Sequence, residues 1–135
     1  MTDAPLIFVV DDDNDFLEME TTILGGAGYR VKCFSDPRAA FEAATAPGAD
    51  CRPSLVVTDL MMKSLDAGFS LAVALKTHPA LSAVPVIVVS AVSSQKGFDF
   101  RPRTAEDLAA MNADAFFDKP VAPQALLGKV KELLR

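Results

Sequence analysis

A short β-branched run, Leu55–Thr58, leads directly into Asp59 and narrows the choice of fold more than any other stretch of the chain. Apolar runs of this length, bounded by polar residues, are typical of strands that are covered on both faces. In an open parallel sheet, the residues that carry function lie just beyond the carboxyl ends of the strands. The run therefore predicts a buried parallel strand that delivers Asp59 to the functional edge of a sheet.

The remaining elements follow from the same kind of pattern. Further strands are expected over Leu6–Val10, residues 29–34, residues 86–89 and Ala115–Asp118. Helical signals lie between and after them. The first helix is capped by Asp13 or Asn14 and stops at Gly25, Gly26 and Gly28, and the second, over residues 38–45, is started by Ser35, Asp36 and Pro37. Further helices are expected over residues 69–76 and 104–111 and from Pro123 or Gln124 to residue 134. Five strands that alternate with five helices predict a single α/β domain over residues 1–135, with a five-stranded parallel sheet and helices on both faces.

Composition excludes several classes of partner. The net charge is −5, the basic residues are scattered, and no apolar run approaches the length of a bilayer span. Nucleic acid and anionic membrane should therefore repel the chain. Cys33 and Cys51 lack metal-binding or redox spacing, and the N-terminus lacks a signal-peptide pattern. We therefore expect reduced thiols and a cytoplasmic protein.

Polar residues follow four of the expected strands, and the carboxyl ends of parallel strands share one edge of a sheet. Asp11, Asp12 and Asp59 should converge there, where two charges ~4 Å apart repel by roughly 4 kcal/mol at an effective dielectric near 20. An all-oxygen cluster of this kind favours Mg²⁺. Lys119 adds an amine and Ser90 adds a hydroxyl group. Carboxylate, cation, amine and hydroxyl together suit phosphoryl transfer, which predicts an aspartyl phosphate on Asp59.

The chain resembles the receiver domain of two-component response regulators along nearly all of its length. The motifs that carry the resemblance are the acidic pair Asp11 and Asp12, Asp59 followed by Asp66, Ser90 with Ala91, Phe116, and Lys119 with Pro120. Each motif is common when taken alone, but all of them occur here in order, each at a strand end. The resemblance implies a flavodoxin-like (βα)₅ three-layer sandwich.

The resemblance also implies roles for these residues. Asp12 and Asp59 would bind Mg²⁺ directly with the backbone carbonyl of Met61, and Asp11 would act largely through water. Lys119 would pair with the phosphoryl group, and Ser90 would bond to it and couple to a switch of Phe116. The bond between Lys119 and Pro120 is usually cis in the family. A sensor histidine kinase or histidine phosphotransfer protein would be the donor, the output partner is unknown, and the family allows a phosphorylation-dependent homodimer.

The sequence departs from the family pattern in three places. Lys63 stands where the family usually has proline. The family also has glycine directly after the acidic turn residue, where this chain has Ala67 and then Gly68. Ser90 and Lys119 are also separated by an excess of about two helical turns of chain. The excess falls in residues 93–103, so we expect an extended loop before the fourth helix.

Other interpretations of these residues exist. Phe116 is explained equally well as a buried core aromatic, and Asp11 or Asp12 as a helix cap. A metal-dependent phosphatase that passes through an aspartyl phosphate is one alternative function, although Met61 stands where such enzymes tend to have a second acid. A degenerate receiver that binds partners without phosphorylation is another, although the full set of acids and Lys119 disfavours it.

Overall fold

The computed structural model describes residues 4–46, 52–59, 71–90, 113–118 and 121–134. In these residues a five-stranded parallel sheet has the order β2-β1-β3-β4-β5. The strands are β1 (Leu6–Val10), β2 (Arg30–Phe34), β3 (Leu55–Thr58), β4 (Val86–Ser90) and β5 (Ala115–Asp118). The helices are α1 (Asn14–Gly26), α2 (Pro37–Thr45), α3 (Leu71–Thr77) and α5 (Pro123–Leu133). The predicted α/β sandwich with a parallel sheet is confirmed.

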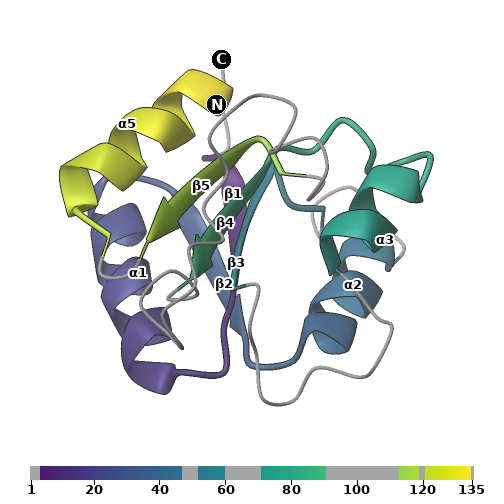
Figure 1. Cartoon of the computed structure of the whole chain (residues 1–135), viewed down its shortest axis with the longest axis horizontal. Helices are drawn as coiled ribbons and strands as arrows, with labels where there is room; N and C mark the ends of the chain where they lie inside the picture. The colour runs from purple at the N-terminus through teal and green to yellow at the C-terminus, as the bar shows by residue number, and fades with distance from the viewer. Residues whose placement is uncertain (1–3, 47–51, 60–70, 91–112, 119–120, 135) are drawn as a thin grey trace, which may run out of the picture.

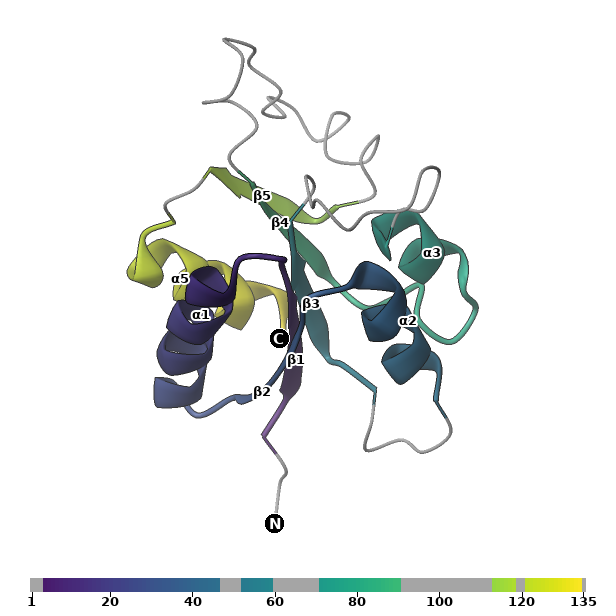
Figure 2. The ribbon, with the colours of Figure 1, turned by 90° about the horizontal axis from the view of Figure 1, so that it is seen from below.

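Helices cover both faces of the sheet. Helices α1 and α5 lie on one side of it, and α2 and α3 lie on the other (Figures 1 and 2). Successive strand residues point to opposite faces, so Val57 packs in the cluster that contains Leu126 of α5, whereas Val56 packs in the cluster that contains Leu75 of α3. Strands β1 and β3 are buried along their whole length, which explains why their sequences are apolar without alternation.

Two aspartates begin helices as N-caps. Asp13 accepts from the backbone N–H groups of Asp15 and Phe16 at the start of α1, and Asp36 accepts from that of Arg38 at the start of α2. Both caps lie where the sequence placed helix starts. Each accepts orphan N–H groups that would otherwise lack a partner in the first turn.

Helix α1 ends at Gly26, within the group of glycines where its end was predicted. Gly25 and Gly26 belong to the helix, because Ala27 and Gly28 still donate to the carbonyls of Leu24 and Gly25 at 3.1 and 3.0 Å. The chain turns away at Gly28, whose φ of 99° suits glycine. Strand β4 extends one residue further than predicted, to Ser90, because Ser90 is still paired in register with β5.

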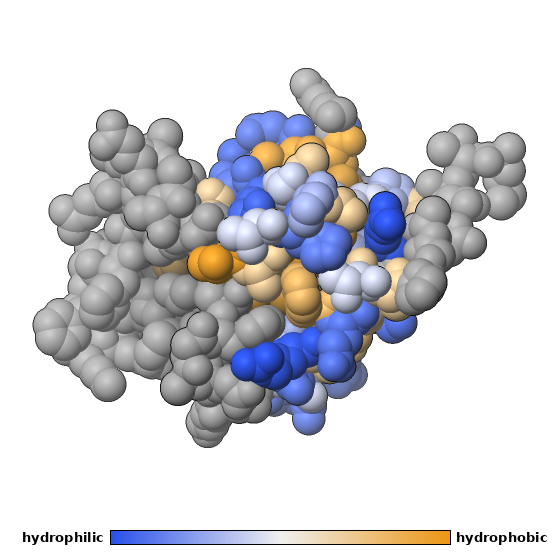
Figure 3. Space-filling model, turned by 90° about the vertical axis from the view of Figure 1, so that its right-hand side faces the viewer, coloured by the Kyte–Doolittle hydropathy of each residue, from blue (hydrophilic) through white to orange (hydrophobic). Residues whose placement is uncertain are grey.

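The outer surface of the α2 and α3 side shows hydrophilic residues with hydrophobic ones between them (Figure 3). On α3, Val73 is exposed. Within the described ranges, no helix has both the length and the apolar character that crossing a membrane requires. The predicted helix over residues 104–111 and the predicted loop over residues 93–103 lie outside the described residues.

Candidate metal centre

The backbone of three neighbouring strands fixes the start of the candidate site. Val10 of β1 is paired in register with Thr58 of β3, so the chain leaves both strands at the same level. The N–H of Asp59 donates to the carbonyl of Val10 at 3.0 Å, and the N–H of Asp11 donates to the carbonyl of Phe34 at 3.0 Å. The residues that follow β1 and β3 are therefore held side by side at the carboxyl edge of the sheet.

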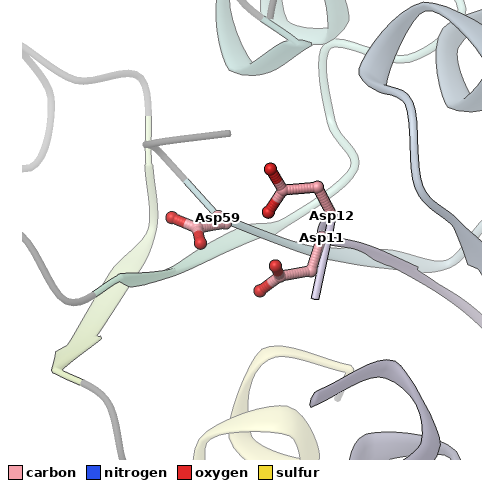
Figure 4. A group of neighbouring side chains, drawn as sticks. All are labelled: Asp11, Asp12 and Asp59. Atoms are coloured by element: carbon pink, nitrogen blue, oxygen red, sulfur yellow. The ribbon is translucent and has the colours of Figure 1, made fainter. Parts of the chain in front are cut away.

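Three carboxylates meet at this edge. One oxygen from each of Asp11, Asp12 and Asp59 lies within 4.8 Å of the others. Their side chains lie close together and project in the same direction from the ends of β1 and β3 (Figure 4). Asp11 is fully buried, Asp59 is 7% exposed, and Asp12 is half-buried. The predicted convergence of these three residues is what the geometry shows.

The chain that leads into α1 orients Asp11. Its Oδ1 accepts from the backbone N–H of Asp13 at 2.9 Å. Asp13 in turn caps α1, whose Phe16 and Leu17 are anchored in the core next to the sheet. The direction of the Asp11 carboxylate is thus tied to the position of a whole helix.

The cluster has the electrostatic character of a cation site. Two carboxylates whose oxygens lie 4.8 Å apart repel by roughly 3 kcal/mol at an effective dielectric near 20. A cation between the oxygens would turn this repulsion into attraction, and hard divalent cations prefer oxygen ligands. Asp11, Asp12 and Asp59 are therefore suited to hold a metal ion.

Two other predicted site residues lie on the neighbouring strands. Ser90 ends β4, and Thr58 of β3 pairs with Val88 of the same strand, so the Ser90 backbone lies at the same edge as the acidic cluster. Phe116 pairs in register with Val88 and packs, partly buried, against the core cluster beneath α2 and α3. This packing fits the core interpretation of Phe116, and its role as a switch stays a prediction.

The remaining predicted site residues lie outside the described part of the chain. They are Met61, with its proposed carbonyl ligand, and Lys119 and Pro120, with their proposed cis bond. Their roles stay predictions.

Sequence reasoning missed Asp114, which precedes β5. Its Oδ2 accepts from the backbone N–H of Val86 at 2.8 Å and from Nζ of Lys76 at 2.9 Å. The only local signal was an aspartate directly before a strand. Both partners are far away in the sequence, so that signal did not identify them.

The comparison with known families decides the class of protein. The profile of the response regulator receiver domain matches residues 7–131. The chain belongs to the response regulator receiver domain family. Among curated relatives, PrrA of Mycobacterium tuberculosis, a transcriptional regulatory protein, is 36% identical over 98% of this chain and 51% of its own length. The transcriptional regulatory protein GltR of Pseudomonas aeruginosa is 31% identical over 96% of this chain and 48% of its own length. The chain spans about half the length of these relatives.

Solved receiver domains share the fold. The receiver domain of a signal transduction histidine kinase from Syntrophus aciditrophicus is 27% identical, with a TM-score of 0.73 over 97% of this chain and 90% of that one. The receiver domain of the sensor histidine kinase PA1611 from Pseudomonas aeruginosa has a TM-score of 0.76 at 20% identity, covering 97% of this chain and 98% of its own. That structure holds a magnesium ion in its active-site cleft. The described sheet and helices thus have the architecture of known receiver domains.

Proposed function

We propose that this receiver domain is the phosphoacceptor of a two-component relay and that Asp59 accepts the phosphoryl group. The observation that carries the proposal is the meeting of Asp11, Asp12 and Asp59 at the carboxyl edge of a receiver-type sheet. Asp59 follows the central strand β3, and its backbone is bonded to β1. The proposed nucleophile therefore follows a strand that is paired on both sides, with β1 and with β4.

The residues fit a magnesium ion. Asp11, Asp12 and Asp59 would hold it, with the carbonyl of Met61 as a further proposed ligand. Mg²⁺ prefers oxygen ligands and is commonly bound through one or two carboxylates together with phosphate oxygens. When bound, it would neutralise charge on the oxygens of the transferring group. Magnesium in the PA1611 receiver domain supports this assignment.

The transfer step uses the carboxylate of Asp59. One of its oxygens forms a bond to phosphorus while the bond between phosphorus and the donor histidine nitrogen breaks. The electron pair of that bond returns to the imidazole, and Asp59 becomes an acyl phosphate. Attack by water on the acyl phosphate later releases inorganic phosphate and restores Asp59. Lys119 and Ser90 are proposed to bind the phosphoryl oxygens.

The proposal also concerns the extent and location of the domain, its phosphoryl donor and the surface that responds to phosphorylation. Residues 1–135 would act as one receiver domain in the cytoplasm. A sensor histidine kinase or phosphotransfer protein would be the donor, and the surface around the fourth helix and β5 would respond through Ser90 and Phe116. The only reactions proposed for the domain are its own phosphorylation and dephosphorylation.

Phosphorylation by a small donor tests the proposal. The protein is incubated with acetyl phosphate and Mg²⁺, and its intact mass is measured. We expect the mass of one added phosphoryl group, which disappears with a chelator and in Asp59→Ala. Asp36→Ala is the matched control, because it removes an aspartate that caps α2 and is not part of the acidic cluster.

Other outcomes would favour the rival functions. An unmodified mass for the folded protein would point to a receiver that works without phosphorylation. Sustained hydrolysis of an added phosphate ester would point to a phosphatase. Modification that persists in Asp59→Ala would contradict the assignment of the acceptor.

A further inference from the structure

The hydrophobic pattern of β4 and β5 specifies their register only weakly. Strand β4 is aliphatic over its first four residues, and β5 carries two adjacent phenylalanines. Phe116 packs on the α2 and α3 side, and Phe117 packs on the α1 and α5 side. A slip of one residue exchanges the faces of a strand. Here such a slip would replace one phenylalanine with another against an apolar layer, so a further contact has to define the pairing.

Asp114 supplies that contact at the start of both strands. Its backbone N–H donates to the carbonyl of Val86 at 2.7 Å, and its Oδ2 accepts from the N–H of Val86 at 2.8 Å. One residue therefore engages both backbone polar groups of the first residue of β4. A slip of one residue would break both bonds together, because they converge on Val86 alone.

Lys76 connects this contact to the helical layer. Its Nζ donates to Oδ2 of Asp114 at 2.9 Å and to the carbonyl of Val84 at 3.0 Å. The side chains of Lys76 and Asp114 are 21% and 37% exposed. Solvent screens a pair with this exposure, so its attraction is modest. The ion pair contributes mainly to positioning, because Lys76 joins the end of α3 to the chain entering β4 and to the chain entering β5.

We propose that Asp114, held by Lys76, is a positioning residue that fixes the β4–β5 register and thereby the second half of the phosphoryl site. In this register Ser90 lies opposite Asp118, and Lys119 follows Asp118 in the chain. A slip of one residue moves a strand by about 3.3 Å. Displacements of about 1 Å in a reacting site can reduce rates by roughly a hundredfold.

The position of Asp114 predicts a split between two properties. The acidic cluster belongs to β1 and β3, whereas Asp114 acts on β4 and β5 at the opposite edge of the sheet. Loss of the contact should therefore slow phosphoryl transfer and leave the affinity for Mg²⁺ unchanged. The activity part of this inference rests on the proposed function, but the register part does not.

Three variants test the inference. Asp114→Ala removes the acceptor, Asp114→Asn keeps an oxygen that can accept from Val86, and Lys129→Met removes an ion pair of 3.0 Å on α5 as the matched control. Each protein is measured for inter-strand nuclear Overhauser contacts between Ser90 and Asp118, for Mg²⁺ affinity by calorimetry, and for the rate of phosphorylation by acetyl phosphate at saturating Mg²⁺. Lys76→Met, which leaves the bonds between Asp114 and Val86 in place, serves if Asp114→Ala does not fold.

The expected result is specific to Asp114. Asp114→Ala should lose the Ser90–Asp118 contacts and react roughly tenfold or more slowly, with Mg²⁺ affinity within about twofold of the parent because distant sites act independently. Asp114→Asn should restore both the contacts and the rate, Lys129→Met should change neither, and Lys76→Met should show a weaker form of the same loss. The inference is overturned if the alanine variant keeps the parent contacts, if its Mg²⁺ affinity falls as much as its rate, or if Lys76→Met changes nothing. If the parent protein is never phosphorylated, the proposed function fails, and the contacts between Ser90 and Asp118 still decide the role of Asp114.

Discussion

The acidic cluster brings together the carboxylates of Asp11, Asp12 and Asp59. Without a bound cation, the folded protein would be more stable with fewer negative charges at this position. Asp11 and Asp59 are buried, and oxygens of all three lie within 4.8 Å of one another. Mutual repulsion of this kind opposes folding unless a cation is bound. The same residues that would bind the metal should therefore lower the stability of the metal-free protein.

Asp12→Asn tests this conflict between stability and binding. Asp12 is half-buried, so solvent reduces the effect of its charge. Without Mg²⁺ we expect the variant to be more stable than the parent by about 1 kcal/mol, which corresponds to a rise in Tm of about 4 °C for a chain of this size. With Mg²⁺ the parent should gain more stability than the variant, because it binds the ion more tightly. Urea unfolding in chelator and in Mg²⁺ measures both quantities.

The control for this variant is Asp15→Asn in the first turn of α1. It removes a charge outside the acidic cluster and should change stability little or slightly lower it, since acidic residues favour a helix N-terminus. A loss of stability in Asp12→Asn without metal, together with an unchanged response to Mg²⁺, would contradict the proposed repulsion.

Asp13 and Asp36 offer a matched pair of helix caps. Both accept backbone N–H groups in the first turn of a helix, but only Asp13 is also joined to the acidic cluster, through the bond from its N–H to Asp11. Alanine at either position should lower the free energy of unfolding by about 1 kcal/mol. Only Asp13→Ala should also weaken Mg²⁺ binding, because it would loosen the turn that orients Asp11. Chemical unfolding and calorimetric titration with Mg²⁺ check the two effects, and equal Mg²⁺ affinities for the two variants would refute the connection.

At the scale of helices and strands, the sequence predicted best where one short-range rule dominates. Strands β1 and β3 have the bounds that were expected, because a continuous apolar run leaves little choice for a doubly covered strand. Asp13 and Asp36 were found at helix starts because capping is local. The end of α1 falls at Gly26, among the glycines that predicted it, because glycine favours the left-handed turn that ends a helix.

Only some contacts between distant segments could be predicted from the sequence. Asp114 meets Val86 and Lys76 across 28 and 38 residues, and no local pattern announces such a partner. The convergence of Asp11, Asp12 and Asp59 was predictable because each follows a strand and parallel strands share an edge. No local pattern predicted the order of the strands. It followed only from the flavodoxin-like fold that the resemblance implies, and the structure places β1 and β3 next to each other.

Adjacent leucines on α5 test how that helix is anchored. Leu126 is fully buried in the cluster beneath α1 and α5, whereas Leu127 is only partly buried against it. Leu126→Ala should lower the free energy of unfolding by about 2–5 kcal/mol, because it leaves a cavity that its neighbours cannot fill. Leu127→Ala, which removes the same atoms, should cost clearly less. Urea unfolding compares the two, and equal losses would mean that α5 is not anchored through Leu126.

For the whole molecule, strand order explains why the site lies where it does. Strand β1 has β2 on one side and β3 on the other, so the chain reverses its direction of winding at β1. The helices accordingly pack on opposite faces, with α1 on one side and α2 on the other (Figure 2). A crevice forms at the carboxyl ends of the strands where winding reverses. The three acidic residues stand at this point, and Ser90 ends a strand on the same edge.

The central claim is that Asp59 carries the phosphoryl group. The most direct measurement treats the protein with acetyl phosphate and Mg²⁺, reduces any acyl phosphate with borohydride, and sequences the peptides by mass spectrometry. Reduction converts a phosphorylated aspartate into homoserine, so the modified position is recorded in a stable residue. We expect homoserine at position 59 alone, and none without Mg²⁺. Homoserine at another aspartate, or none in a protein shown to be folded and to bind Mg²⁺, would contradict the account.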